Sequence, residues 1–246
     1  MNDKTSFVRP QKKLAPGVSV VSTCRSGGVS ENQYAAFNLA LHCGDNKAHV
    51  LENRSLLERT LKLPNSPCWL KQIHGSDIIE ADHPFNSTPT ADGIYTRAQN
   101  TVCAVMTADC LPLVLCDKDG HQLMAIHAGW RGIAEGIVEK AVALFDCSPQ
   151  AIRAWAGPTI GPNAFEVGPE VIAQLGGDEN AYRLSNNGGG RHYADLAALV
   201  GARLSALGVV EYAYANLCTY AYPERFFSYR RDGQTGRMAT LIWKDV

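Results

Sequence analysis

Short apolar stretches occupy much of the chain and predict β-strands. They are rich in Val, Ile and Leu and are bounded by Gly, Pro, Asp or Asn, as strands usually are. The first, at 18–24, reads VSVVSTC and is followed by a glycine-containing loop. The others cover 68–74, 77–81, 101–107, 111–117, 122–127 and 152–157.

Apolar residues at helical spacing predict three helices. Asp45-Asn46 can cap a first helix over 47–62. A second helix is expected over 131–146, where apolar residues form one stripe. A third is expected over roughly 192–207, ended by Gly208.

The order of these elements predicts the fold class. Strands often follow strands, and the tail at 226–243 reads as two further strands around an Asp-Gly and a Thr-Gly turn. This order favours an α+β fold, a layered α/β sandwich with mixed or antiparallel sheets covered by helices, over a doubly wound parallel sheet. Because no stretch reads as a linker, residues 1–246 are expected to form one domain.

Residues 107–130 are expected to form a β-hairpin, and its register decides which side chains meet. With the turn centred on the Lys-Asp dipeptide, Cys110 faces His127, with Cβ atoms about 4.5–5.5 Å apart. With the turn centred on Asp-Gly, a favoured hairpin dipeptide, His127 faces Pro112 and Cys110 is a diagonal neighbour at about 7–8 Å. Both registers place Cys110 and His127 on one face. The opposite face is the better core face and carries Leu111, Leu113, Leu115, Met124 and Ile126.

Three interpretations of Cys110 and His127 stay open on spacing alone. A zinc site needs a third ligand, and His74, at the end of an apolar segment, is the best candidate, although the hairpin does not place it. A Cys–His nucleophile pair needs only the two residues. The third interpretation is a packed cysteine and a turn histidine. A copper site is disfavoured, because neither Met106 nor Met124 is well placed as a further ligand.

Composition and charge narrow the classes of function. The chain has 246 residues, 46% of them hydrophobic, and a net charge of −1. It can form a sizeable core and has no general attraction to nucleic acid or to an anionic membrane. No apolar run has the length of a signal peptide or a membrane span, so a soluble, cytoplasmic protein is expected. The eight cysteines include no Cys-x-x-Cys pair and are expected to be reduced.

Several motifs match one known family, in the same order and over nearly the whole chain. With them, the sequence resembles the bacterial laccase-domain family, whose members are described as polyphenol oxidase, purine nucleoside phosphorylase or peptidoglycan editing factor. The motifs are CRSGGVS and FNLALHCGDN within 24–46, KQIHGSD at 71–77, ADG at 91–93, TADCLPLVL at 107–115, HAGWRG at 127–132, GPTIGPNAFEVG at 157–168, and CTYAYPERFFSYRRDGQTGRMATLIW at 218–243.

The resemblance implies a zinc ion held by two histidines and one cysteine, which by position are His74, Cys110 and His127. It implies phosphate-dependent cleavage of adenosine, inosine and methylthioadenosine, together with deamination of adenosine. The expected partners are therefore a purine nucleoside and phosphate. The alternatives are a hydrolase that edits peptidoglycan precursors with Cys110 as nucleophile, a zinc-stabilised binding protein, and a copper polyphenol oxidase.

The motif HAGWRG carries the strongest candidate for a substrate contact. Arg131 is expected to open a helix, and an arginine at a helix N-terminus is a reasonable anion site. The alternatives are that Arg131 covers the ring of Trp130 or pairs with a surface carboxylate. Gly129 and Gly132 are expected to let the backbone turn tightly into this helix.

Three further polar residues have two interpretations each. Arg25, in the RSGG loop, is a second candidate for binding an anion or is a surface arginine. Asn38, in FNL, contacts substrate or caps a loop. Asp109, beside the cysteine of TADC, orients a ligand histidine or carries a proton.

Overall fold

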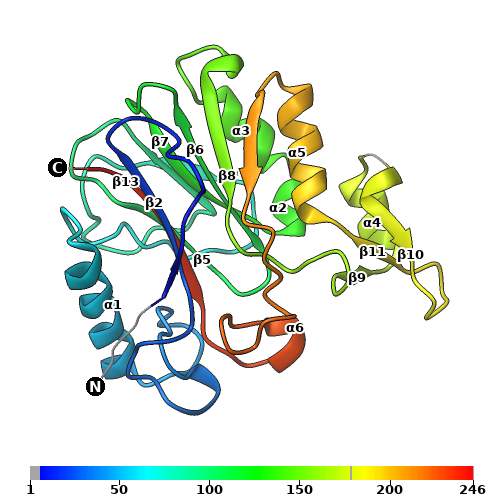
Figure 1. The fold of residues 1–246 in the computed structure, drawn as a ribbon, viewed down its shortest axis with the longest axis horizontal. Coiled ribbons are helices and arrows are strands. Elements are labelled where there is room, and N and C mark those ends of the chain that lie inside the picture. The colour runs from blue at the N-terminus through cyan, green and yellow to red at the C-terminus, as the bar shows by residue number, and fades with distance from the viewer. Residues whose placement is uncertain (1–5, 178, 246) are drawn as a thin grey trace.

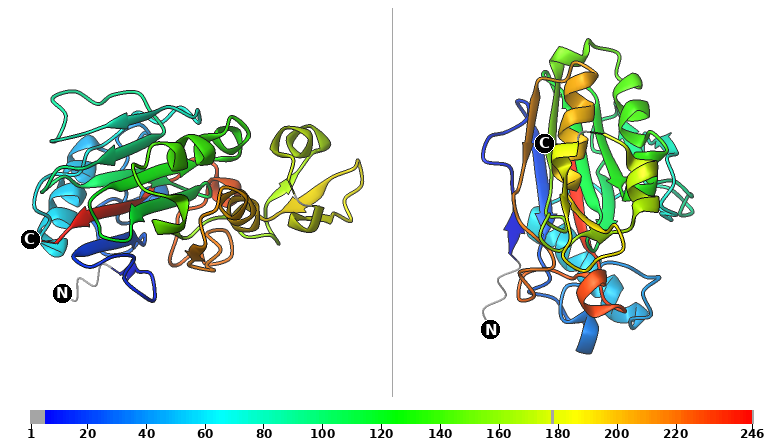
Figure 2. Two further views of the ribbon diagram at one scale, coloured as in Figure 1. Left: turned by 90° about the horizontal axis from the view of Figure 1, so that it is seen from above. Right: turned by 90° about the vertical axis from the view of Figure 1, so that its right-hand side faces the viewer.

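The computed structural model describes residues 6–177 and 179–245 and arranges them in layers (Figures 1 and 2). A helix, a four-stranded sheet, a six-stranded sheet and a group of helices follow one another across the molecule. A small sheet with one helix projects from one end (Figure 1). The sheets are mixed or antiparallel, which confirms the predicted α+β fold.

The six-stranded sheet consists of β3 (Ile78–Glu80), β4 (Gly93–Thr96), β6 (Leu111–Asp117), β7 (Leu123–Ala128), β8 (Ile152–Ala156) and β12 (Glu211–Tyr214). Its order is β12-β8-β6-β7-β4-β3, so the predicted hairpin lies at its centre. The outermost pair on each side is parallel, and the inner pairs are antiparallel. The sheet is therefore mixed.

The four-stranded sheet joins the two ends of the chain. It consists of β1 (Phe7–Val8), β2 (Val18–Thr23), β5 (Cys103–Thr107) and β13 (Met238–Lys244). Its order is β1-β2-β13-β5, and every pair is antiparallel. The small sheet has the order β10-β11-β9 and consists of β9 (Glu166–Val167), β10 (Tyr182–Leu184) and β11 (His192–Ala194).

The helices are α1 (Lys47–Leu61), α2 (Trp130–Ala134), α3 (Ile137–Ala143), α4 (Pro169–Leu175), α5 (Leu196–Ala206) and α6 (Tyr229–Asp232), with 3₁₀ turns at Asn32–Tyr34, Pro149–Ala151 and Glu179–Ala181. Side chains cap three of the helices: Asn46 begins α1, Asp195 begins α5 and Ser228 begins α6. No helix within the described residues is long and apolar enough to cross a membrane.

Both faces of the central hairpin are buried. Leu113, Leu115 and Ile126 pack under α2, α3 and α5, and so they form part of the core that the sequence predicted for that face. Val114 and Leu123 point the other way and pack against the four-stranded sheet. Burial on both faces explains why β6 and β7 have nearly continuous apolar sequences instead of alternating ones. A third cluster lies between the four-stranded sheet and α1.

The hairpin has the second of the two predicted registers. His127 pairs with Pro112, and Leu111 pairs with Ala128. Cys110, which precedes the strand, is therefore a diagonal neighbour of His127. The register leaves 118–121 as the loop, and the N–H of Gly120 donates to the carbonyl of Asp117.

The predicted strand at 68–74 is wrong. This segment makes only isolated bridges, at Cys68 and Lys71. The side-chain amide of Gln72 bonds both the N–H and the C=O of Met106, at 2.8 Å each, and so takes the place of a backbone ladder. His74 then has a φ of +65°, which no regular strand allows.

Three other boundaries differ from the prediction. The helix expected over 131–146 is two short helices, because Gly136 adopts a φ of +83° between them. The helix expected from residue 192 begins only at Leu196, because 192–194 pair as β11. The tail contains one strand instead of two, because Ser228 starts the single helical turn α6 where the first was expected.

Candidate metal centre and adjoining cavity

Three side chains from separate segments converge on one point. His74 lies on the loop before β3, Cys110 directly precedes β6, and His127 is the penultimate residue of β7. One ligand atom from each lies within 4.8 Å of the others. The two imidazole rings meet edge to face, with centroids 4.8 Å apart and planes at 82°. The fold therefore brings together the three residues that the resemblance implied as ligands.

A buried carboxylate, Asp92, orients two of these ligands. Its Oδ1 lies 2.7 Å from Nδ1 of His127, which directs Nε2 of that ring toward the cluster. The carboxylate also accepts hydrogen bonds from the backbone N–H groups of Ile73, His74 and Gly75, at 2.8–3.0 Å. Asp92 therefore holds His127 by its side chain and His74 by its backbone.

The charges in the metal-free cluster favour a thiolate and an imidazolium. Burial by itself would raise the pKa of the Cys110 thiol, but His127 and then His74 outweigh it and lower this pKa to about 6. Burial likewise opposes the charge on His127, but the Cys110 thiolate and the Asp92 carboxylate raise the His127 pKa to about 9. Two of the three ligands therefore form an ion pair at neutral pH.

The cluster fits a metal ion in donor chemistry and in space. Two imidazoles and a thiolate are borderline ligands of the kind that Zn²⁺ prefers, and three protein ligands leave a position open. Gly129 lies against them: a Cβ there would be 3.2 Å from the Cys110 sulfur and 3.4 Å from each of the two histidine rings. A second potential cluster among the described residues, Asp117, Asp119 and His121, is mostly exposed at the hairpin turn.

The three ligands lie on the wall of a cavity of about 410 Å³, a size typical of small-molecule sites. Three arginine side chains line it, together with a single acidic one, Asp109. Aromatic and apolar groups make up much of the rest. The lining residues are His42, Gln72, His74, Met106, Thr107, Ala108, Asp109, Cys110, His127, Trp130, Arg131, Ile160, Phe165, Tyr229, Arg230 and Arg237.

Of the three predicted substrate contacts, only Arg131 lines the cavity. Arg131 lines the cavity and also lies over the ring of Trp130, 4.4 Å from its centroid. Arg25 is outside the cavity lining and donates to the carbonyls of Ala35 and Pro223. Asn38 is fully buried, bonds its own loop and accepts from the backbone N–H of Arg237.

Asp109 does not orient a ligand histidine. Its carboxylate accepts hydrogen bonds from the hydroxyl of Thr219, at 2.6 Å, and from the backbone N–H of Arg230, at 2.7 Å. It therefore anchors the C-terminal loop to the residue before the cysteine ligand. The orienting role that the sequence offered to Asp109 belongs to Asp92.

Sequence reasoning missed several residues of the site. Asp92, His42, Gln72 and Arg237 all lie in or behind the cavity wall. Asp92 and His42 belong to motifs that match the family, ADG and FNLALHCGDN, but neither motif has a spacing that points to a metal or an anion. Asp92 follows the polar stretch NSTPTA at 86–91 and directly precedes β4, so the local sequence carries no signal for its role.

Comparison with known proteins finds one family over nearly the whole chain. The family described as multi-copper polyphenol oxidoreductase laccase matches residues 19–245. The purine nucleoside phosphorylase YfiH of Shigella flexneri is 45% identical, over 97% of this chain and 99% of that protein. Its counterpart in Escherichia coli K12 is 44% identical with the same coverage.

Two solved structures share the fold. A Neisseria meningitidis protein that is 38% identical superposes with a TM-score of 0.90, covering 98% of this chain and 99% of that one. YlmD of Geobacillus stearothermophilus is 28% identical and has a TM-score of 0.92, covering 100% and 98%. The chain therefore belongs to the laccase-domain family.

Proposed function

We propose that this chain is a zinc-dependent purine nucleoside phosphorylase that acts on adenosine, inosine and methylthioadenosine and also deaminates adenosine. The observation that carries the proposal is the convergence of His74, Cys110 and His127 on a cavity that presents arginine and aromatic side chains. The names of the Shigella flexneri and Escherichia coli relatives support the reaction.

The cavity suits an attacking phosphate. Cleavage of the C1′–N9 bond leaves the sugar cationic and the base anionic, so the phosphate must be held close to the sugar. Arg131 is exposed and its guanidinium contacts the Trp130 ring by its face, which leaves its N–H groups for an anion. Arg230 and Arg237 each use one nitrogen, Nη1, on backbone carbonyls and add positive charge to the same wall.

The remaining wall suits the purine and the metal. Phe165 and Ile160 are buried apolar surfaces of the cavity, and Tyr229 is an exposed ring at its edge. When bound, the zinc ion would supply positive charge for a phosphate or substrate oxygen. Adenosine would place its glycosidic bond and its amino group in one cavity of about 410 Å³, so one site can serve both proposed reactions.

Zinc is the metal that the donor set favours. The family description names copper, and Met106, which the sequence did not favour as a further ligand, lies on the cavity wall. Metal analysis of the purified protein separates the two metals. Zinc at about one ion per chain supports the proposal, whereas copper with oxidase activity toward phenols would replace it.

A nucleoside panel with and without phosphate tests the reaction. We expect phosphate-dependent release of adenine or hypoxanthine by the parent protein. His74→Ala should lose both the metal and this activity. His83→Ala, which removes an exposed histidine outside both potential metal clusters, is the matched control and should keep both.

The low pKa of Cys110 favours one rival, a thiol hydrolase that edits peptidoglycan precursors. That enzyme would survive chelation of the metal and would lose activity when Cys110 is alkylated. This pattern would overturn the phosphorylase proposal. Bound zinc without turnover of nucleosides or cell-wall precursors would leave a zinc-stabilised binding protein.

A further inference from the structure

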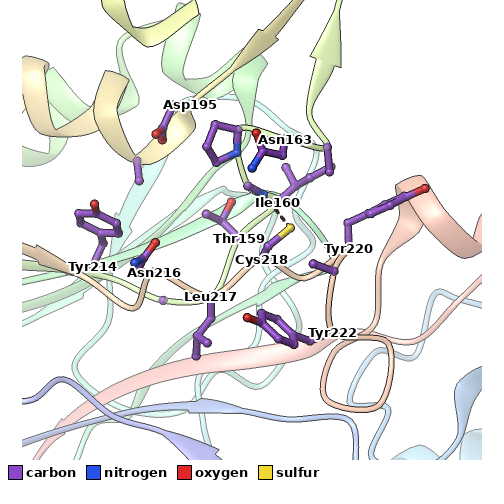
Figure 3. A pocket seen from close by; sticks show the side chains of 16 residues that line it. Thr159, Ile160, Asn163, Asp195, Tyr214, Asn216, Leu217, Cys218, Tyr220 and Tyr222 are labelled. Atoms are coloured by element: carbon purple, nitrogen blue, oxygen red, sulfur yellow. Dashed lines mark hydrogen bonds between the residues drawn. The ribbon is translucent and has the colours of Figure 1, made fainter. Parts of the chain in front are cut away.

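A second cavity lies beside the metal centre and contains none of its ligands. Its volume is about 390 Å³, and it lies between the segment 157–164 and the segment 214–222 (Figure 3). Ile160 is the one residue that lines both cavities. The second cavity is built from the motifs GPTIGPNA and CTYAY, to which the proposed reaction gives little role.

Aromatic rings border this second cavity. In Figure 3, Tyr214 lies at one end of it and Tyr220 at the other, and Tyr222 lies below the sulfur of Cys218. Tyr214 is 53% exposed and Tyr222 is 42% exposed, so their rings are accessible to a ligand. Ring faces of this kind bind flat heterocycles by stacking.

The polar groups of the second cavity suit a ligand with donors and acceptors along its edge. Asp195 caps α5 through Oδ1, which leaves its other carboxylate oxygen as an acceptor. Asn163 accepts from Arg183 through Oδ1, which leaves its amide N–H groups as donors. The side chain of Asn216 has no hydrogen-bond partner within the part of the chain that the structure describes.

Charge excludes one class of ligand. No Lys, Arg or His is among the lining residues, and Asp195 is the one ionisable carboxylate there. A phosphate group would meet negative charge without compensation. This is the opposite of the metal cavity, which three arginines line.

We propose that the second cavity binds an uncharged purine base or its nucleoside, at a site separate from the metal centre. Stacking surfaces, amide groups and a carboxylate together match the faces and the edge of a nucleobase. A free monosaccharide, with hydroxyls on all sides, would need more polar partners than these walls provide. The inference does not rest on the proposed reaction, because it concerns binding without turnover.

The second cavity is tied to the metal centre by hydrogen bonds. The hydroxyl of Thr159 and the N–H of Ile160 both donate to the carbonyl of Asp109, at 2.8 and 2.9 Å. Asp109 directly precedes Cys110 in the chain. Two residues that line the second cavity are therefore bonded to the residue directly before the cysteine ligand.

Alkylation of Cys218 provides a local readout of occupancy. The thiol is partly exposed, lines the second cavity and accepts a hydrogen bond from the N–H of Gly161 at 3.1 Å. The metal-loaded protein would be treated with iodoacetamide in phosphate-free buffer, with and without adenine, and each cysteine followed by peptide mass spectrometry. Adenine at about four times its Kd should slow alkylation of Cys218 about fivefold, because only the free site reacts. Cys147, in a different cavity, is the internal reference and should be unaffected.

Variants and other ligands test whether adenine protects Cys218 by binding in the second cavity. Tyr222→Ala should abolish the protection of Cys218 by adenine, whereas Leu184→Ala, at an exposed position outside both cavities, should keep it. Adenosine should protect like adenine, and AMP should protect much less. Equal protection by AMP, protection by glucose but not by adenine, or protection that persists in Tyr222→Ala would each overturn the proposal. Protection of Cys110 without Cys218 would also overturn it, by placing the purine in the metal cavity alone.

Discussion

At the scale of single residues, Asp92 is the side chain on which the metal centre depends most. It is fully buried and directly precedes β4, between the segment of His74 and the strand of His127. Four of its hydrogen bonds go to these two segments. Burial alone would raise the pKa of the Asp92 carboxyl, but the hydrogen bond from His127 and those from the backbone lower it, so the group is ionised.

Asp92→Asn should therefore weaken metal binding more than it weakens the fold. The amide keeps the shape of the side chain but loses the charge that favours the correct tautomer of His127. We expect a loss of about 10–100-fold in metal affinity, measured by competition with a chromophoric chelator. Asp195→Asn is the control, since this carboxylate also accepts a backbone N–H group, at the start of α5, and belongs to neither potential metal cluster. Equal affinities for the Asp92 variant and the parent would refute the orienting role.

The ion pair of Cys110 and His127 predicts a proton release when metal binds. Between pH 6 and 9 the metal-free site holds a thiolate and a protonated imidazole, because the two pKa values are about 6 and about 9. A histidine binds a metal only as the neutral imidazole, so His127 has to lose its proton. Affinity should rise with pH up to about 9, and about one proton from His127 should be released at neutral pH.

Calorimetry in buffers of different ionisation enthalpy measures this release. The parent protein should release about one proton for each metal ion that it binds at neutral pH. Below pH 6 the release should increase, because Cys110 is then protonated as well. Zinc binding by the parent protein at neutral pH without any proton release would contradict this protonation state.

At the scale of elements, the glycines of HAGWRG serve close packing. The sequence suggested that they allow a tight turn, yet Gly129 has a φ of −67° and Gly132 is helical, which any residue can adopt. A Cβ on Gly132 would lie 2.6 Å from the carbonyl oxygen of Gly75. Helix α2 therefore packs directly on the loop that carries His74, backbone against backbone.

Gly132→Ala should separate these two elements. The added methyl group meets backbone and cannot move aside, so we expect a loss of about 1–3 kcal/mol in the free energy of unfolding, measured by urea denaturation. Gly129→Ala is the comparison: its Cβ would be no closer than 3.2 Å to its neighbours, so stability should change less. That variant should instead bind metal more weakly, since its methyl group crowds the Cys110 sulfur. Equal stability of Gly132→Ala and the parent would exclude the contact.

The hairpin was predictable from the sequence and the third ligand was not. Strand periodicity alone places Cys110 and His127 on one face, and the Asp-Gly turn selects the register that the structure has. His74 has a positive φ, and its segment is held by the side chain of Gln72 instead of by a strand ladder. No hydrophobic periodicity in the sequence therefore indicates where His74 lies. Asp92 acts across the sheet, and cross-sheet contacts of this kind have no local sequence pattern.

At the scale of the molecule, the metal centre and its cavity need the whole fold. The cavity lining runs from His42 to Arg237, and Asn38 holds the backbone of Arg237 in place. The C-terminal loop reaches the cavity because β13 lies between β2 and β5, and because Asp109 anchors it near the cysteine. The sequence indicated α+β layers. It did not indicate that the C-terminal loop would meet the Asn38 loop, nearly 200 positions away along the chain.

Because the metal binds segments that only folding brings together, its removal should lower the thermal stability of the whole chain. A ligand specific for the folded state stabilises it by about 4 kcal/mol when its concentration is about 1,000 times its Kd. In a chain of this length each kcal/mol moves Tm by about 2–4 °C. Chelation should therefore lower Tm by about 8–16 °C under such conditions, as measured by calorimetry, and zinc should restore it. His74→Ala should start near the lower Tm and respond to neither treatment, whereas His83→Ala should behave as the parent. A parent protein whose Tm ignores chelation, although metal analysis confirms that the ion has left, would show that the fold forms the cluster without help from the metal.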